Sequence, residues 1–85
     1  MAYYVYILQS ELDGTYYLGS TANLEVRVAR HNQGGSRYTK AKRPWKLIHS
    51  EEFGNKSDAL IRERQIKKRK SREYIETLVR TVVTS

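Results

Sequence analysis

The sequence has no cysteine and no apolar run long enough to cross a membrane. Without cysteine, the chain can form no disulfide and no zinc-thiolate site, and it has no thiol nucleophile. Its start lacks a charged segment and a small-residue cleavage site, so we expect no secretory signal and a cytoplasmic protein. The 85 residues suffice for one small domain, which we expect to span residues 1–85.

Acidic residues are also few, because nine Asp and Glu stand against 16 Lys and Arg, for a formal net charge of +7. In a small domain this balance favours a polyanionic partner, most often nucleic acid. The basic residues cluster in a loop before the single proline and in a run near residue 68. We predict that both clusters contact phosphates; they comprise Arg37, Lys40, Lys42, Arg43, Lys67, Lys68, Arg69 and Lys70.

Tyrosine is abundant, and five of the seven tyrosines lie within residues 3–31. This stretch predicts two strands, over residues 3–8 and 15–20, joined by a turn at Asp13-Gly14. A helix should follow, from an N-cap at Asn23 to a stop at Gly34-Gly35. The first strand is apolar on both faces, which is typical of a strand in the middle of a sheet.

Downstream, the pattern predicts a loop over residues 36–44, a strand over residues 45–53 and a helix that begins near Asn55. A last helix, over about residues 71–84 with Ser71 as its cap, should pack on a core of about residues 3–70. The predicted fold class is therefore α+β, with a three-stranded sheet flanked by helices in the order ββαβαα. The residues predicted to share one register on the third strand are Trp45, Leu47, His49, Glu51 and Phe53.

Helical periodicity sends several polar groups toward the interior. Arg27 and His31 fall on the apolar face of the first helix, and Glu63 falls in the middle of the apolar face of the second. We expect the hydroxyls of Tyr6 and Tyr17 nearby. Each group alone has a structural explanation; Glu63, for instance, can pair with the lysine four residues later. Together they are costly to bury in a thin core, which favours a functional site. The apolar residues on these two faces are Leu24, Val28, Ala59, Leu60 and Ile66.

These five groups suit the hydrolysis of a phosphodiester. An arginine can hold phosphate oxygens and stabilise the charge that develops on them. A carboxylate can hold a divalent cation, and a tyrosine or histidine can take the proton of an attacking water. Tyrosine is a poor base unless nearby cations lower its pKa from about 10. Because only Glu63 points inward, we expect no two-metal site.

The motifs resemble the GIY-YIG nuclease superfamily. The first tripeptide corresponds to Tyr4-Val5-Tyr6 and the second to Tyr17-Leu18-Gly19. Arg27, His31 and Glu63 fall where this family has an arginine, a histidine and a metal-binding glutamate. More closely, the chain resembles the small stand-alone bacterial proteins of the UPF0213 group in the stretches YVYIL, NLEVRVARHN, KRPWKLIHSEEF and ALIRERQIKK.

The resemblance implies a metal-dependent endonuclease that acts on DNA, with a preference for DNA structure and a link to DNA repair or processing. It implies one Mg²⁺ or Mn²⁺ on Glu63, and Arg27 on the scissile phosphate. Tyr6, with Tyr17 or His31, would lie around the nucleophilic water, and which group takes the proton is left open. The alternative is a non-catalytic nucleic-acid-binding module on the same fold. No membrane and no protein partner are indicated.

Overall fold

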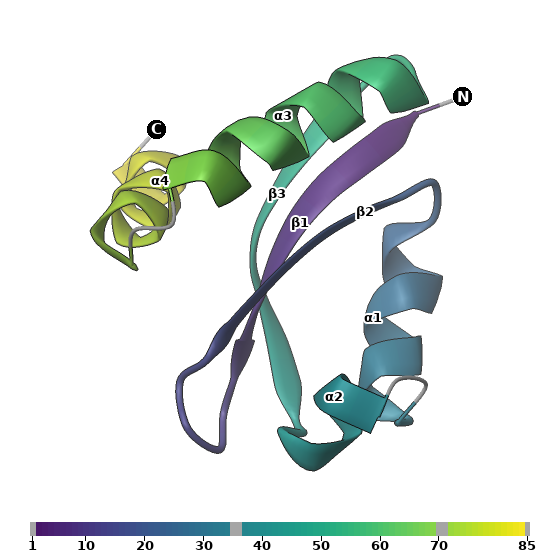
Figure 1. Cartoon of the computed structure of the whole chain (residues 1–85), viewed down its shortest axis with the longest axis vertical. Coiled ribbons are helices and arrows are strands. Elements are labelled where there is room, and N and C mark those ends of the chain that lie inside the picture. Colours follow the sequence, from purple (N-terminus) through teal and green to yellow (C-terminus); the bar gives the residue numbers. More distant parts are fainter. Residues whose placement is uncertain (1, 35–36, 70–71, 85) are drawn as a thin grey trace.

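The computed structural model describes residues 2–34, 37–69 and 72–84 (Figure 1). Its elements follow one another in this order: β1 (Tyr3–Ser10), β2 (Tyr16–Thr21), α1 (Leu24–Asn32), α2 (Arg37–Ala41), β3 (Trp45–Phe53), α3 (Lys56–Arg69) and α4 (Arg72–Thr84). The strands form one antiparallel sheet in the order β2-β1-β3, which confirms the α+β prediction. Within these described ranges, no helix is long and apolar enough to span a membrane.

Strand β1 is the centre of the structure, as its two apolar faces predict. Val5, Ile7 and Leu8 are fully buried, and neighbouring residues of the strand point to opposite faces of the sheet. β1 continues to Ser10, two residues further than predicted. The Ser10 hydroxyl donates a hydrogen bond of 2.7 Å to the carbonyl of Lys42, which ties this end of the strand to the segment before β3.

The two faces of β1 bury two separate cores. On one face, Val5 packs with Ala59 and Ile66 of α3. On the other face, Tyr6 and Leu8 pack with Trp45, and the partly buried Leu24 and Val28 of α1 cover them. Figure 1 shows the same division, with α1 and α2 on one side of the sheet and α3 on the other.

The predicted turns and helix caps are confirmed where the structure describes them. Gly14 has φ +78°, the left-handed conformation that glycine adopts without steric cost. The side chain of Asn23 caps α1 by accepting a hydrogen bond of 3.1 Å from the backbone N–H of Val26. Asn55 caps α3 in the same way, at 2.8 Å from the N–H of Asp58. Ser71, the predicted cap of the last helix, lies outside the described residues.

The loop predicted over residues 36–44 is wrong in part, because residues 37–41 form the short helix α2. The reason lies in tertiary contacts. Thr39 is fully buried, and its backbone carbonyl accepts a hydrogen bond of 2.8 Å from the indole N–H of Trp45. Burial of this threonine against the indole favours a compact turn of helix over an open loop.

The single inner register predicted for β3 is also wrong. Ile7 pairs with His49, but the next residue, Leu8, pairs with Leu47, so Ile48 is an extra residue in β3. Such a bulge inverts the alternation of side chains along a strand. Trp45 therefore packs against the core under α1, whereas Phe53 packs against the core under α3.

Two leucines predicted to face inward are instead 38% exposed. Leu47 lies on β3 just before the bulge, and Leu60 lies on α3 next to the fully buried Ala59. On α3, Ala59 and Ile66 occupy the line of closest approach to the sheet, and Leu60 is turned about 100° from Ala59 around the helix axis. The inward face of α3 is therefore narrower than the hydrophobic pattern suggests.

The burial of β1 predicts how a truncation in the strand should act. Leu8→Ala removes a fully buried side chain and should lower the free energy of unfolding by about 2–5 kcal/mol. Leu12→Ala is the matched control, because Leu12 is 66% exposed; it should change stability by less than about 0.5 kcal/mol. Urea denaturation of both variants measures the difference, and equal losses would contradict the described core.

Candidate active site

Three of the predicted site residues meet in one cluster on the α1 side of the sheet. Tyr6 comes from β1, Tyr17 from β2 and His31 from α1. The Tyr6 hydroxyl lies 3.1 Å from His31 Nε2, within hydrogen-bonding distance. The rings of Tyr17 and His31 are 4.7 Å apart between centroids, and those of Tyr6 and Tyr17 are 6.4 Å apart. Because Tyr6 and His31 are almost completely buried, each satisfies the other's polar atom inside the core.

Gly19 leaves the room that the Tyr6 phenol occupies. The two residues pair directly across β1 and β2. A Cβ atom at position 19 would lie 2.6 Å from the Tyr6 hydroxyl oxygen, closer than non-bonded atoms can approach. The second tripeptide therefore needs glycine at position 19 because the phenol of Tyr6, in the first tripeptide, fills the space that a side chain would take.

Arg27 lies one turn before His31 on α1, as the helical spacing predicts, and its side chain is half-buried. Its positive charge acts on both members of the hydrogen-bonded pair. Burial raises the pKa of Tyr6 well above its ordinary value, and Tyr17 raises it further, while Arg27 opposes this shift. Arg27 does lower the pKa of Tyr6, as expected of a nearby cation. Burial has the larger effect, however, so the net pKa of Tyr6 is raised.

His31 is held in its neutral form by the same surroundings. Burial is the main cause that lowers its pKa below the ordinary value of 6.5, and the charge of Arg27 lowers it further. At neutral pH the pair is therefore a phenol and a neutral imidazole. The unprotonated Nε2 tautomer of His31 can then accept the hydrogen bond that the Tyr6 hydroxyl donates.

Glu63 lies on α3, and its negative charge adds a smaller contribution to the raised pKa of Tyr6, after burial and Tyr17. Its side chain is only 15% exposed, and one oxygen lies 2.7 Å from Lys67 Nζ. The pairing with the lysine four residues later, which the sequence allowed, is thus present. The contact of 2.7 Å with Lys67 is the polar contact that the structure describes for the Glu63 carboxylate, and its role as a metal ligand stays a prediction.

A single carboxylate fits a loosely held divalent cation better than a protein-enclosed metal centre. Within residues 2–34, 37–69 and 72–84 there is no group of three His, Cys, Asp or Glu side chains that could hold a metal. Mg²⁺ is commonly bound through one or two carboxylates, with water and substrate phosphates as its remaining ligands. The hard oxygen atoms of Glu63 fit that pattern.

The predicted phosphate contacts are divided between the two sides of the sheet. Lys40 and Arg43 are exposed at α2 and after it, whereas Lys68 and Arg69 are exposed on α3, on the opposite side (Figure 1). Lys42 Nζ instead lies 2.6 Å from the carboxylate of Asp13, and this contact lowers the pKa of Asp13. Lys70 and the side chain of Arg37 lie outside the described part of the chain.

The sequence did not predict a polar network on the α3 side of the sheet. His49 Nε2 lies 2.7 Å from a carboxylate oxygen of Glu51, and the other oxygen accepts a bond of 2.8 Å from Arg62 Nε. Arg62 also donates a bond of 3.3 Å to the hydroxyl of Tyr74. The bond to Glu51 raises the pKa of Arg62. The sequence does offer one sign of this network: His49 and Glu51 are two residues apart on one strand, which places their side chains on the same face of the sheet.

A comparison of the chain with models of known protein families identifies its family. The profile of the GIY-YIG catalytic domain matches residues 2–75, which is most of the chain. The chain therefore belongs to the GIY-YIG family, whose domain is nuclease-like, implies a nucleic-acid substrate and generally uses a divalent metal.

Several individual relatives of the chain are UPF0213 proteins. The chain is 47% identical over 66 residues to a UPF0213 protein of Staphylococcus haemolyticus, covering 76% of this chain and 79% of that protein. It is 46% identical over 77 residues to a UPF0213 protein of Syntrophus aciditrophicus, covering 88% and 87%. The NMR structure of a UPF0213 protein from Bacillus halodurans superposes with a TM-score of 0.60 at 35% identity, over 95% of this chain and 85% of that one. The resemblance to UPF0213 proteins is thus confirmed.

The contact between Gly19 and Tyr6 predicts the effect of one added methyl group. Gly19→Ala should push the phenol away from His31, change the NMR shift of the His31 imidazole, and cost about 1–3 kcal/mol of stability through overpacking. Gly54→Ala is the control, because no atom lies within 4 Å of its added Cβ. A Gly19→Ala variant with the His31 signal of the wild type would show that the phenol does not need this space.

The neutral state of His31 predicts a pH dependence of stability. Because its pKa is lowered on folding, the unfolded chain binds the proton more tightly. This contribution to stability is present above about pH 6.5 and is lost as the pH falls through the folded pKa. Arg27→Gln should raise the pKa of His31 only partway, since burial is the larger cause. An NMR titration measures both values; a wild-type pKa above 6.5 would contradict the described environment.

Proposed function

We propose that this protein is a metal-dependent endonuclease that hydrolyses phosphodiester bonds in DNA. The observation that carries the proposal is the hydrogen bond between Tyr6 and His31, 3.1 Å long, at a phenol that also lies within the fields of Arg27 and Glu63. Membership of the GIY-YIG family supports the class of reaction. A phenol, an imidazole, a guanidinium and a carboxylate are the groups that this hydrolysis needs.

The Tyr6–His31 pair would move the proton of the attacking water. As the water oxygen bonds to phosphorus and the bond to the leaving oxygen breaks, the Tyr6 oxygen accepts the water proton and passes its own proton to His31 Nε2. This relay avoids a free phenolate, whose formation is opposed by the burial that raises the pKa of Tyr6. The neutral His31 is the form able to receive that proton.

Arg27 would hold the scissile phosphate beside this pair. Its guanidinium offers a planar fork of donors that matches two phosphate oxygens, and it stabilises the charge that develops on them. The effect of Arg27 on the pKa of both Tyr6 and His31 supports its placement at the reacting group. Tyr17, whose ring lies against His31, would keep the imidazole oriented.

Glu63 would hold one Mg²⁺ or Mn²⁺, and its contact with Lys67 would break when the ion binds. When bound, such an ion polarises a phosphoryl oxygen and stabilises the leaving oxygen. Lys67, which is 56% exposed, can turn toward solvent or a phosphate without burying a charge. We further propose that the enzyme selects DNA structure rather than sequence, as in DNA repair or processing, because lysine and arginine contacts to phosphates carry no sequence information.

A second function is favoured by one observation. The contact of 2.7 Å between Glu63 and Lys67 neutralises the carboxylate that the prediction assigns to the metal, so this carboxylate has a partner without a metal. A domain of this kind with exposed basic residues could bind nucleic acid and leave it intact. The two functions differ in what a divalent cation does to the protein.

Glu63→Gln separates the two functions. If Glu63 holds the ion, Mn²⁺ should stabilise the wild type by mass action, and the variant should lose this gain. The variant should also lose cleavage while its affinity for DNA stays equal or rises slightly, since a negative charge near phosphate is removed. Thermal melts with and without Mn²⁺, paired with cleavage of a panel of duplex, branched and single-stranded DNA, measure both effects.

Glu76→Gln is the matched control for this experiment. Glu76 also forms an i, i+4 pair with a basic residue, 3.5 Å from Arg72, but it lies exposed on α4. It should keep both the Mn²⁺ stabilisation and the cleavage of the wild type. A folded Glu63→Gln variant that cleaves normally would exclude Glu63 as the essential ligand. A wild type that binds DNA with neither cleavage nor Mn²⁺ stabilisation would establish the binding module.

A further inference from the structure

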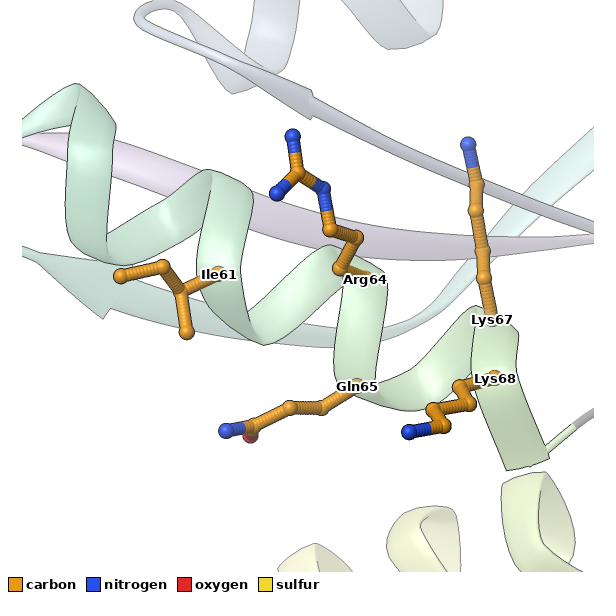
Figure 2. Close-up of a pocket in the computed structure, with 5 residues that line it drawn as sticks. All are labelled: Ile61, Arg64, Gln65, Lys67 and Lys68. Carbon is orange, nitrogen blue, oxygen red and sulfur yellow. The ribbon is translucent and has the colours of Figure 1, made fainter.

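The surface of α3 carries two adjoining hollows. The first, of about 500 Å³, is lined by Ile61, Arg64, Gln65, Lys67 and Lys68, which Figure 2 shows. The second, of about 640 Å³, is lined by Arg62, Gln65, Lys68, Arg69 and Tyr74, at the junction of α3 and α4. Because Gln65 and Lys68 line both, the two hollows form one surface, which we call the α3 groove.

Most of the residues that line the α3 groove carry a positive charge. Five of its lining residues are Lys or Arg, and neither hollow is lined by an aspartate or a glutamate. In Figure 2, Arg64 and Lys67 project to one side of the helix, while Gln65 and Lys68 project to the other. A ligand lying across the helix would therefore meet cations on both sides, which calls for an anion with more than one charge.

The junction end of the groove has side chains that are already held in place. Glu51 accepts bonds of 2.8 and 3.3 Å from Arg62, and Arg62 donates to Tyr74 at 3.3 Å. The guanidinium of Arg69 lies over the Tyr74 ring, 5.0 Å from its centroid. Glu51 offsets the charge of Arg62, so the excess positive charge comes from Lys68 and Arg69. Arg62 and Tyr74 form the frame that positions Arg69, which lowers the entropy cost of binding an anion.

The other end of the groove lies beside Glu63, the carboxylate to which the proposed function assigns the metal. Lys67 lines the first hollow and also contacts Glu63, the carboxylate whose charge reaches Tyr6. A strand held near Glu63 would therefore meet further cations along α3. Ile61, which is 53% exposed, adds an apolar contact suited to sugars or bases between the phosphates.

We propose that the α3 groove binds the backbone of a nucleic-acid strand beside the cleavage site, with one phosphate at the α3–α4 junction against Lys68 and Arg69. This inference rests on the proposed function, and it adds a second phosphate site outside the cluster of Tyr6 and His31. The site fixes the direction in which the bound strand leaves the catalytic cluster. It contributes affinity without taking part in proton transfer.

The test compares two double variants that each remove two exposed cations. Lys68→Ala/Arg69→Ala alters the groove, and Lys46→Ala/Lys56→Ala alters exposed positions elsewhere. Binding of a labelled long duplex, and of a short duplex that covers only the cleavage site, is measured between low and physiological salt. The groove variant should bind the long duplex about tenfold more weakly, with the log–log salt slope reduced by about 0.9 for each phosphate lost.

The remaining results decide between the ligands that a basic groove could take. The control variant should lose clearly less affinity for the long duplex than the groove variant does. Equal losses in both double variants would overturn the proposal and leave the groove to an acidic protein partner. Inorganic phosphate or a mononucleotide that shifts the Gln65 and Tyr74 NMR signals at the concentration of the duplex would also overturn it, in favour of a free phosphate ligand.

Two further measurements keep the outcome clear. Lys68→Ala alone leaves the contact between Arg69 and Tyr74 intact, so it should show part of the affinity loss even if the double variant loosens α4. The inference and the proposed function also fail differently. A wild type that binds the long duplex through the groove but never cleaves it would refute the hydrolysis alone, whereas normal cleavage with equal losses in the two double variants would refute the groove alone.

Discussion

A buried phenol must find a partner for its hydroxyl, and in this protein that requirement connects three elements. Tyr6 lies on the most buried strand, where an unsatisfied hydroxyl would cost on the order of 1–3 kcal/mol. His31 accepts the bond from α1, and Gly19 on β2 leaves the space in which the ring lies. A change in any one of these residues disturbs the other two, so the stability of the sheet and the geometry of the cluster depend on the same contact.

Burial and charge oppose each other at this contact. Burial keeps Tyr6 protonated and His31 neutral, whereas Arg27 favours the ionised form of Tyr6 and the neutral form of His31. Burial and Arg27 both keep His31 neutral, so the pair rests as a phenol that can donate its hydrogen bond to an uncharged imidazole.

Much of this structure could be predicted from local rules. The central position of β1, the caps at Asn23 and Asn55, and the meeting of Tyr6, Tyr17 and His31 follow from alternation, capping and helical spacing. The short helix α2 and the bulge at Ile48 could not be predicted in this way, because burial of Thr39 and the pairing of β3 with β1 decide them. The network that joins Glu51 to Arg62 depends on that bulge and was missed for the same reason.

Because of the bulge at Ile48, the two halves of the edge strand β3 bury their side chains in different cores. Before it, Trp45 belongs to the core under α1; after it, His49, Glu51 and Phe53 belong to the layer under α3. Loss of that one residue would not merely shorten the chain. It would move the side chains of the second half of β3 to the opposite face of the sheet, and the charged network would then lie where apolar side chains now lie. Length at this point is therefore under stricter constraint than residue type, and related chains should tolerate replacements here more readily than deletions.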